Sequence, residues 1–155
     1  IFACCGILFN HESPLRGLEF VTRKITYELA LIKYKKQKKF KLGNIYAKRD
    51  WGFAGDYVEA MWLMLQQKQP EDYVISTGES HSVEDFLNLA TEFSELGDWK
   101  NLVEIDKSIL RPTDIDDLVG DSSKARTQLG WKPKMNFRQL VKSMVEHDLE
   151  FVKTY

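Results

Sequence analysis

The sequence predicts an α/β fold in which short strands and amphipathic helices alternate along the whole chain. Two observations support this prediction: apolar segments of strand length recur, and most are followed by longer segments with apolar residues at helical spacing. The chain has 155 residues, of which 43% are hydrophobic. This is enough apolar material for one packed core, so we expect a folded domain.

The first predicted strand covers residues 1–9, which form a continuous apolar run. Such a run is typical of a strand covered on both faces in a parallel sheet. Residues 10–17 are polar and turn-forming, and Pro14 prevents regular pairing there. We expect a loop at the carboxyl end of the strand, where ligands bind in open α/β sheets. The chain begins in this strand without an initiator Met, so we expect it to be truncated.

A helix is predicted over residues 20–36, with these apolar side chains at helical spacing: Val21, Ile25, Leu29 and Ile32. The lysine-rich residues 33–41 complement the negative end of the helix dipole and are interpreted as a solvated helix end. A short strand over residues 40–42 and a loop over residues 47–50 are expected next.

A second helix is predicted over residues 53–67. Its buried face is expected to contain Val58, Met61, Trp62 and Leu65. The cluster of Met61, Trp62 and Met64 is interpreted as a core stripe without a ligand.

The remaining elements follow the same alternation. A strand over residues 73–76 precedes a helix that begins at Ser82, where Asp85 forms a relative of the capping box. After a strand over residues 102–105, Ser122 or Ser123 is expected to cap a short helix that ends at Leu129-Gly130. The last amphipathic helix is predicted over residues 137–152.

The charge balance excludes some classes of partner. The 23 acidic and 22 basic residues nearly cancel, so no long-range field would recruit nucleic acid or an anionic membrane. No apolar run reaches the roughly 20 residues that a membrane-spanning helix needs. We expect a soluble cytoplasmic protein, and the adjacent Cys4 and Cys5, which could form only a strained disulfide, fit a reducing compartment. The three histidines are far apart, so we predict no metal site.

Two signals of dinucleotide enzymes are missing or unconvincing. The nine glycines are scattered and form no phosphate-binding loop. Tyr34 and Lys38 have the Tyr-x-x-x-Lys spacing of short-chain dehydrogenases, but they lie in the lysine-rich helix end, where this spacing arises by chance.

Polar groups at the ends of predicted loops form the remaining candidate site: Asn10, His11, Arg16, Lys24, Lys48, Arg49 and Arg111. Guanidinium and ammonium groups that converge on one crevice would suit a diphosphate. Taken singly, a basic residue of this kind is more often an ordinary surface charge than a ligand contact.

Several of these residues lie in recognisable motifs. The blocks Asn10-His11-Glu12-Ser13-Pro14 and Ala47-Lys48-Arg49-Asp50-Trp51-Gly52 resemble those of GDP-mannose 4,6-dehydratases, which are extended short-chain dehydrogenases/reductases. Leu129-Gly130-Trp131-Lys132-Pro133 is similar to an ending that many sugar-nucleotide epimerases and dehydratases share. The resemblance spans nearly the whole chain.

The resemblance implies the end of an NADP-binding Rossmann sheet plus a smaller C-terminal substrate-binding α/β domain. Residues 1–17 would be the last part of the Rossmann domain and its ligand loop, and residues 18–155 the substrate domain. The rest of the Rossmann domain, with the catalytic residues, would be absent. The complete enzyme would convert GDP-mannose to GDP-4-dehydro-6-deoxymannose with elimination of water, recycle NADP and form a homo-oligomer, a dimer or tetramer. This part would bind GDP-mannose and be inactive alone.

The resemblance also implies roles for individual residues. His11 and Arg16 match contacts to NADP, and Asn10 matches a contact near the sugar diphosphate. Three basic residues and one acid match groups that hold the GDP portion: Lys24, Arg49, Arg111 and Asp114. Asp114 replaces a Glu that is common in the family.

Two other positions depart from the family pattern, because Leu15 replaces Arg and Tyr46 replaces Asp. The alternative functions are a related nucleotide-sugar dehydratase or reductase, or a non-catalytic nucleotide-binding module.

Overall fold

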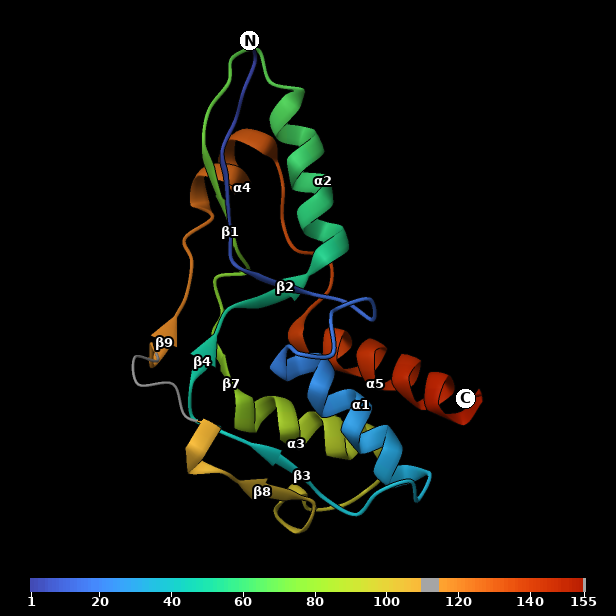
Figure 1. Cartoon of the computed structure of the whole chain (residues 1–155). Coiled ribbons are helices and arrows are strands. Elements are labelled where there is room, and N and C mark those ends of the chain that lie inside the picture. The colour runs from blue at the N-terminus through green and yellow to red at the C-terminus, as the bar shows by residue number, and fades with distance from the viewer. Residues whose placement is uncertain (110–114, 155) are drawn as a thin grey trace.

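The computed structural model describes residues 1–109 and 115–154 (Figure 1). Its helices are α1 (Val21–Lys33), α2 (Ala54–Leu65), α3 (Val83–Ser94), α4 (Ser123–Leu129) and α5 (Phe137–Thr154). Its strands are β1 (Gly6–Leu8), β2 (Asn10–Glu12), β3 (Phe40–Leu42), β4 (Lys48–Arg49), β5 (Trp51–Phe53), β6 (Tyr73–Ile75), β7 (His81–Ser82), β8 (Val103–Ile105) and β9 (Asp117–Leu118). Short 3₁₀ turns cover Trp99–Asn101 and Lys107–Ile109. The predicted α/β class is confirmed.

Strand pairing in the described residues is mostly parallel. β1 pairs with β6, β2 with β5 and β3 with β8, all in parallel, whereas β4 lies antiparallel to β7 and parallel to β9. The β2–β5 register places Asn10 opposite Trp51 and His11 opposite Gly52. This pairing brings two distant sequence motifs side by side.

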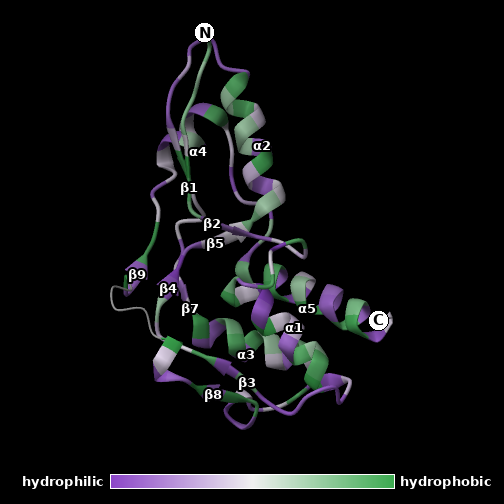
Figure 2. Cartoon of the chain, in the orientation of Figure 1, coloured by the Kyte–Doolittle hydropathy of each residue, from purple (hydrophilic) through white to green (hydrophobic). Residues whose placement is uncertain are grey.

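The larger core lies where α1, α3 and α5 pack on one another, in the lower part of Figure 1. Ile25 and Leu29 of α1 and Phe86 of α3 are fully buried there, and Figure 2 shows the apolar faces of these helices turned toward their neighbours. The predicted apolar stripe of α1 is therefore confirmed. The capping relation at α3 is a complete capping box, in which Ser82 Oγ accepts from the Asp85 amide and the Asp85 carboxylate accepts from the Ser82 amide.

The smaller core joins α2, β6 and α4, with Cys4 and Leu8 packed against it. The predicted face of α2 is wrong: Val58, Trp62 and Leu65 are 61%, 60% and 57% exposed. The helix instead buries its other face, which consists of Asp56, Tyr57, Ala60 and Met64. Met64 is thus the only buried member of the expected Met61-Trp62-Met64 stripe.

A buried carboxylate explains why α2 turns this way. Asp56 accepts hydrogen bonds from the amides of Lys134 and Met135 at 2.9 and 3.1 Å, and its own carbonyl accepts from Trp131 Nε1 at 2.8 Å. Apolar residues occur on both sides of α2, so their periodicity does not select a face. The polar contacts of Asp56 do.

Three further expectations are corrected. Residues 1–9 contain a strand only at Gly6–Leu8, and Ile7 is 56% exposed because no other described segment covers that face. Residues 10–17 begin as strand β2, and residues 47–50 contain strand β4 instead of a loop. Both strands form because each finds a parallel neighbour that is distant in the sequence.

The predicted cap of α4 also differs in detail. Ser122 holds the N-cap position, but its hydroxyl donates to the Ser76 carbonyl at 2.9 Å. The Asp121 carboxylate accepts from the Ser123 amide instead. Gly130 ends the helix with a left-handed backbone, as expected for its position.

Candidate functional site

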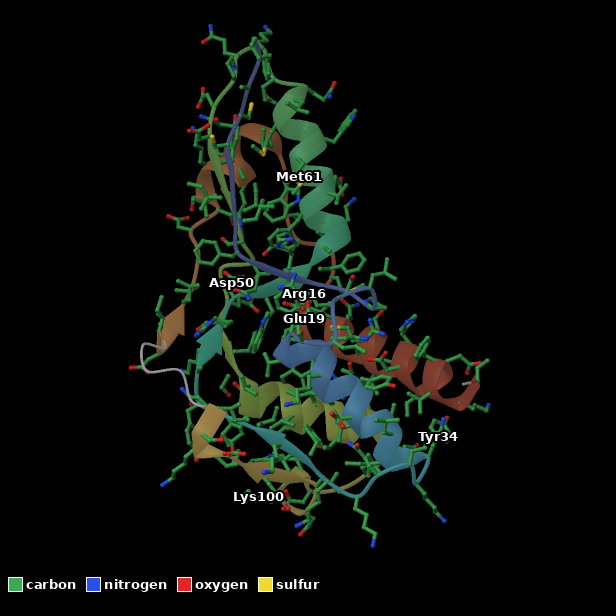
Figure 3. The ribbon with its side chains drawn as sticks, in the orientation of Figure 1. Arg16, Glu19, Tyr34, Asp50, Met61 and Lys100 are labelled. Atoms are coloured by element: carbon green, nitrogen blue, oxygen red, sulfur yellow. The ribbon has the colours of Figure 1, made fainter. Side chains whose placement is uncertain are left out.

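A cavity of about 360 Å³ lies where β2 and β5 meet the beginning of α1. Four predicted site residues line it together: Asn10, Arg16, Lys24 and Arg49. The rest of the lining is mixed, and includes Glu12, Glu19, Phe20, Thr22, Asn44, Trp51 and Ile109. Figure 3 shows Arg16 and Glu19 beside the first turn of α1, below the level of β2.

The topology explains why these residues converge. Asn10 lies on β2 and Arg49 on β4, next to the β5 strand that pairs with β2. Lys24 lies in the first turn of α1, which starts after the loop that carries Arg16. Three cationic side chains from separate segments therefore border one space.

Arg16 is held on two sides. Its Nε lies 3.4 Å from Glu12 Oε2, and its guanidinium carbon lies 3.5 Å from the centre of the Phe20 ring. Within the part of the chain that the structure describes, its terminal Nη nitrogens make no hydrogen bond. The planar fork that binds phosphate oxygens is thus the unengaged end of the side chain.

Glu12 is a site residue that sequence reasoning did not single out. It is only 1% exposed, and Thr22 Oγ1 donates to its Oε2 at 2.7 Å. Burial raises the pKa of Glu12, while the Thr22 hydrogen bond and the Arg16 charge act in the opposite direction. Its place inside the Asn-His-Glu-Ser-Pro motif was the only signal that pointed to it.

A second buried charge fixes the loop that carries Arg16. Arg23 donates from Nη1 to the carbonyls of Pro14 and Arg16, and from Nε to both carboxylate oxygens of Asp148 at 2.9 Å. Asp148 on α5 is fully buried and also accepts from Thr26 Oγ1 at 2.6 Å. The loop is therefore tied to both α1 and α5. Sequence reasoning missed Arg23 because its partner is 125 residues away.

Lys24 and Arg49 donate to main-chain carbonyls. Lys24 Nζ contacts the Lys41 carbonyl at 2.7 Å, and Arg49 Nη1 contacts the Ile115 carbonyl at 2.6 Å. An ammonium has three donors, so the Lys41 contact leaves Lys24 Nζ able to donate to a ligand as well. Both residues line the cavity wall.

Asp50 supports the strands that carry Arg49 and Trp51. It is fully buried and accepts hydrogen bonds from three main-chain amides and one hydroxyl, which belong to Thr77, Gly78 and Gly120. The β4–β5 corner is thereby fixed to the loop after β6. Figure 3 shows Asp50 at this corner.

His11 does not line the cavity. Side chains alternate along a strand, so His11 faces away from Asn10 and Glu12 and its ring stacks on Tyr57. Its Nδ1 donates to the Phe9 carbonyl at 2.9 Å. Burial raises the pKa of Tyr57, and Asp50 and Asp56 add to that effect, so the phenol stays neutral.

The remaining predicted positions lie elsewhere. Arg111 and Asp114 fall outside the described residues. Leu15 and Tyr46 are 87% and 71% exposed and do not line the cavity. Tyr34 is the C-cap of α1, and Figure 3 shows it at the end of the helix far from Arg16.

No group of three or more His, Cys, Asp or Glu side chains is placed to hold a metal ion among the described residues. No helix there is both long enough and apolar enough to cross a membrane.

Comparison with known proteins identifies the family. The family model described as GDP-mannose 4,6 dehydratase matches residues 1–144. The chain belongs to this family. GDP-mannose 4,6 dehydratase 1 of Arabidopsis thaliana is 61% identical over 99% of this chain, and the Homo sapiens GDP-mannose 4,6 dehydratase is 48% identical over 99%. The chain spans only 42% and 46% of the lengths of these two relatives.

Solved structures show the same fold at low sequence identity. RMD from Pseudomonas aeruginosa, complexed with NADPH, matches 96% of this chain and 48% of its own length, with a TM-score of 0.85 and 18% identity. dTDP-glucose 4,6-dehydratase from Bacillus anthracis, in complex with NAD, matches 98% of this chain and 46% of its own length, with a TM-score of 0.80 and 18% identity. The predicted extended short-chain dehydrogenase/reductase fold is confirmed.

Proposed function

We propose that the cavity binds the guanosine diphosphate part of GDP-mannose in an enzyme that converts GDP-mannose to GDP-4-dehydro-6-deoxymannose with loss of water. The observation that carries this proposal is the meeting of Asn10, Lys24 and Arg49 around one cavity in a chain of this family. A diphosphate needs several cationic donors at one place. The volume, about 360 Å³, is within the usual range for small-molecule pockets.

The proposed roles follow the position of each residue. Lys24 and Arg49 bind phosphate oxygens, and the Asn10 amide hydrogen-bonds near the sugar diphosphate. Arg111 and Asp114 complete the GDP contacts. We keep the division between the two domains at residue 17 as part of the proposal. In addition, Cys4 and Leu8, from the first part, pack against the core that α2, β6 and α4 form.

NADP is the proposed cofactor, with Arg16 and His11 as its contacts in this chain. The unengaged Nη atoms of Arg16 fit a phosphate group, and neighbours of the same fold hold NADPH or NAD. When bound, NADP supplies hydride transfer. The chain's own residues bind and orient the ligands: Arg16 and Lys24 are fixed by neighbours before a ligand arrives. We also propose a cytoplasmic homo-oligomer, a dimer or tetramer, and the free thiols of Cys4 and Cys5 fit a reducing compartment.

Calorimetric titration tests the binding site. The chain is titrated with GDP-mannose, GDP and UDP-glucose, and we expect the two guanosine ligands to bind more tightly. Lys24→Met and Arg49→Met should each weaken GDP-mannose binding about tenfold or more, because each removes a charge-assisted contact. Lys100→Met is the matched control, since Lys100 is exposed and distant from the cavity lining.

Product analysis tests the activity. The full-length gene product that contains this chain is supplied with GDP-mannose and NADP, and formation of a 4-keto-6-deoxy sugar nucleotide is measured. Tight GDP-mannose binding without product would favour a non-catalytic nucleotide-binding module. Absence of GDP-mannose binding, or equal losses in the Lys100→Met control, would reject the proposed site.

A further inference from the structure

Arg16 is restrained at three points before any ligand binds. Its backbone carbonyl accepts from Arg23, its Nε faces Glu12 at 3.4 Å, and the Phe20 ring covers one face of its guanidinium at 3.5 Å. The side chain is 23% exposed. These contacts hold a long, flexible side chain in the wall of the cavity.

Glu12 is itself enclosed by its surroundings. It is 1% exposed, it belongs to strand β2, and its carboxylate accepts from Thr22 Oγ1 on α1. A carboxylate in this position is unexpected in a pocket that binds anions, because like charges repel. Its ion pair with Arg16 accounts for its presence: Oε2 lies 3.4 Å from the buried Nε, which makes no hydrogen bond, so Glu12 balances the charge from the inner side and the outer nitrogens are left for a ligand.

We propose that Glu12 is a positioning residue, which holds the Arg16 guanidinium in the orientation that binds a phosphate group of the ligand. The inference rests on the proposed function because the phosphate belongs to the proposed ligands. Immobilising an arginine side chain costs free energy on binding, and a side chain that is fixed beforehand avoids that cost. Glu12 therefore favours anion binding through Arg16 despite its own negative charge.

Nuclear magnetic resonance tests the orientation without any ligand. The Arg16 Nε–Hε group of the wild-type chain should give an ordered signal, and Glu12→Gln should make it mobile. Gln retains the size of Glu12 and an oxygen that can accept from Thr22. Glu92→Gln is the matched control, because Glu92 also pairs with an arginine, Arg138, but on an exposed surface. Equal mobility of Arg16 Nε in the wild type and in Glu12→Gln would overturn the proposal.

A double-mutant cycle tests whether Glu12 acts through Arg16. Affinities for NADP and GDP-mannose are measured for the wild type, Glu12→Gln, Arg16→Met and the double variant. Glu12→Gln should weaken the ligand that Arg16→Met weakens, by about three- to tenfold, and should have no further effect in the Arg16→Met background. Tighter binding in Glu12→Gln, or an equal loss in both backgrounds, would contradict the proposal.

The two measurements separate this inference from the proposed function. If the wild type binds neither ligand, the proposed function fails while the signal of Arg16 Nε still decides whether Glu12 orients the side chain. Thr22→Val offers a second variant that leaves the Glu12 charge in place. It should shift the Arg16 signal in the same direction as Glu12→Gln, by a smaller amount, and no shift would contradict the role of Thr22 as the support of Glu12.

Discussion

The His11 ring stacks on the Tyr57 ring, with centroids 5.3 Å apart and planes inclined by 29°. Tyr57 is fully buried in the smaller core, whereas the neighbours of His11 on β2, Asn10 and Glu12, line the cavity. Through its alternating side chains, the short strand β2 therefore contacts the smaller core on one side and the cavity on the other. Because the ring makes this stack, its contribution to stability can be tested separately from the proposed role of the His11 nitrogens in binding NADP.

Two substitutions at His11 should have different effects on stability. His11→Phe keeps an aromatic ring on Tyr57, whereas His11→Ala removes it and should lower the free energy of unfolding by about 1 kcal/mol. Both remove the imidazole nitrogens, so both should weaken NADP binding. Urea denaturation and NADP titration measure these effects. If His11→Phe is as unstable as His11→Ala, the ring stack on Tyr57 does not stabilise the fold. If both variants keep full NADP affinity, His11 is not a cofactor contact.

Gly52→Ala should disturb the pairing of β2 with β5, in which Gly52 lies opposite His11. A Cβ atom at this position would lie 2.4 Å from the Tyr57 ring, which is fully buried and cannot move aside. We expect a loss of about 1–3 kcal/mol in unfolding free energy from this overpacking. Gly97→Ala is the comparison, because its Cβ would meet nothing within 4 Å and only its positive φ would cost stability. A loss at Gly52 no larger than that at Gly97 would contradict the prediction.

The Arg23–Asp148 pair should be important for stability. Asp148→Ala leaves the Arg23 guanidinium in a mostly buried place without its carboxylate, so we expect a loss of about 3–5 kcal/mol. The exposed Lys142–Glu146 pair is the control, and Glu146→Ala should cost less than about 1 kcal/mol. Urea denaturation measures both. Similar losses for the two variants would show that the buried pair contributes no more to the free energy of unfolding than the exposed pair does.

How far the sequence predicts this fold depends on whether local pattern or distant contact decides each element. The apolar stripe of α1 and the Ser82 capping box are local, and both were predicted correctly. The orientation of α2 depends on the hydrogen bond that Asp56 accepts from the Lys134 amide, 78 residues later. The apolar periodicity of the helix therefore predicted the wrong buried face. The positions of Asn10, Arg16, Lys24 and Arg49 around one cavity follow from strand pairing, which the sequence does not display. Arg23 was missed because its partner Asp148 becomes a neighbour only in the fold. The partners of Glu12 are close in sequence, but its burial depends on the pairing of β2 with the distant strand β5.

Replacing Glu12 should change how stability depends on pH. Burial raises the pKa of Glu12 above 4.5, so the folded chain keeps this proton to a higher pH than the unfolded chain. As pH rises through that window, the folded state binds more protons than the unfolded state, and the contribution of Glu12 to stability decreases. Glu12→Gln cannot titrate.

The difference in unfolding free energy between Glu12→Gln and the wild type should therefore move in favour of the variant as pH rises from about 4.5 toward neutrality. Urea denaturation at a series of pH values measures this difference. The direction in which this free-energy difference changes with pH decides the test. If it stays constant, or if it shifts in favour of the wild type as pH rises, the pKa of Glu12 is not raised in the folded chain.

GDP-mannose affinity should fall as salt increases. The proposed contacts are between cationic side chains and a diphosphate at a site open to solvent, and salt screens such attractions over about 8–10 Å at physiological ionic strength. The Lys24→Met/Arg49→Met double variant should show a shallower salt dependence than the wild type. Titrations at low and high sodium chloride measure the two slopes, and equal slopes would argue against direct contact of these charges with the ligand.

The location of Trp51 gives the protein an intrinsic optical reporter. The chain has four tryptophans, and Trp51 is both 2% exposed and part of the cavity wall. Trp99 and Trp131 are also buried, whereas Trp62 is 60% exposed on α2. A soluble quencher such as iodide should therefore reach Trp62 first. In Trp62→Phe protein the residual emission would come from shielded indoles, one of them beside the ligand, so that occupancy of the cavity could be followed by fluorescence without a label.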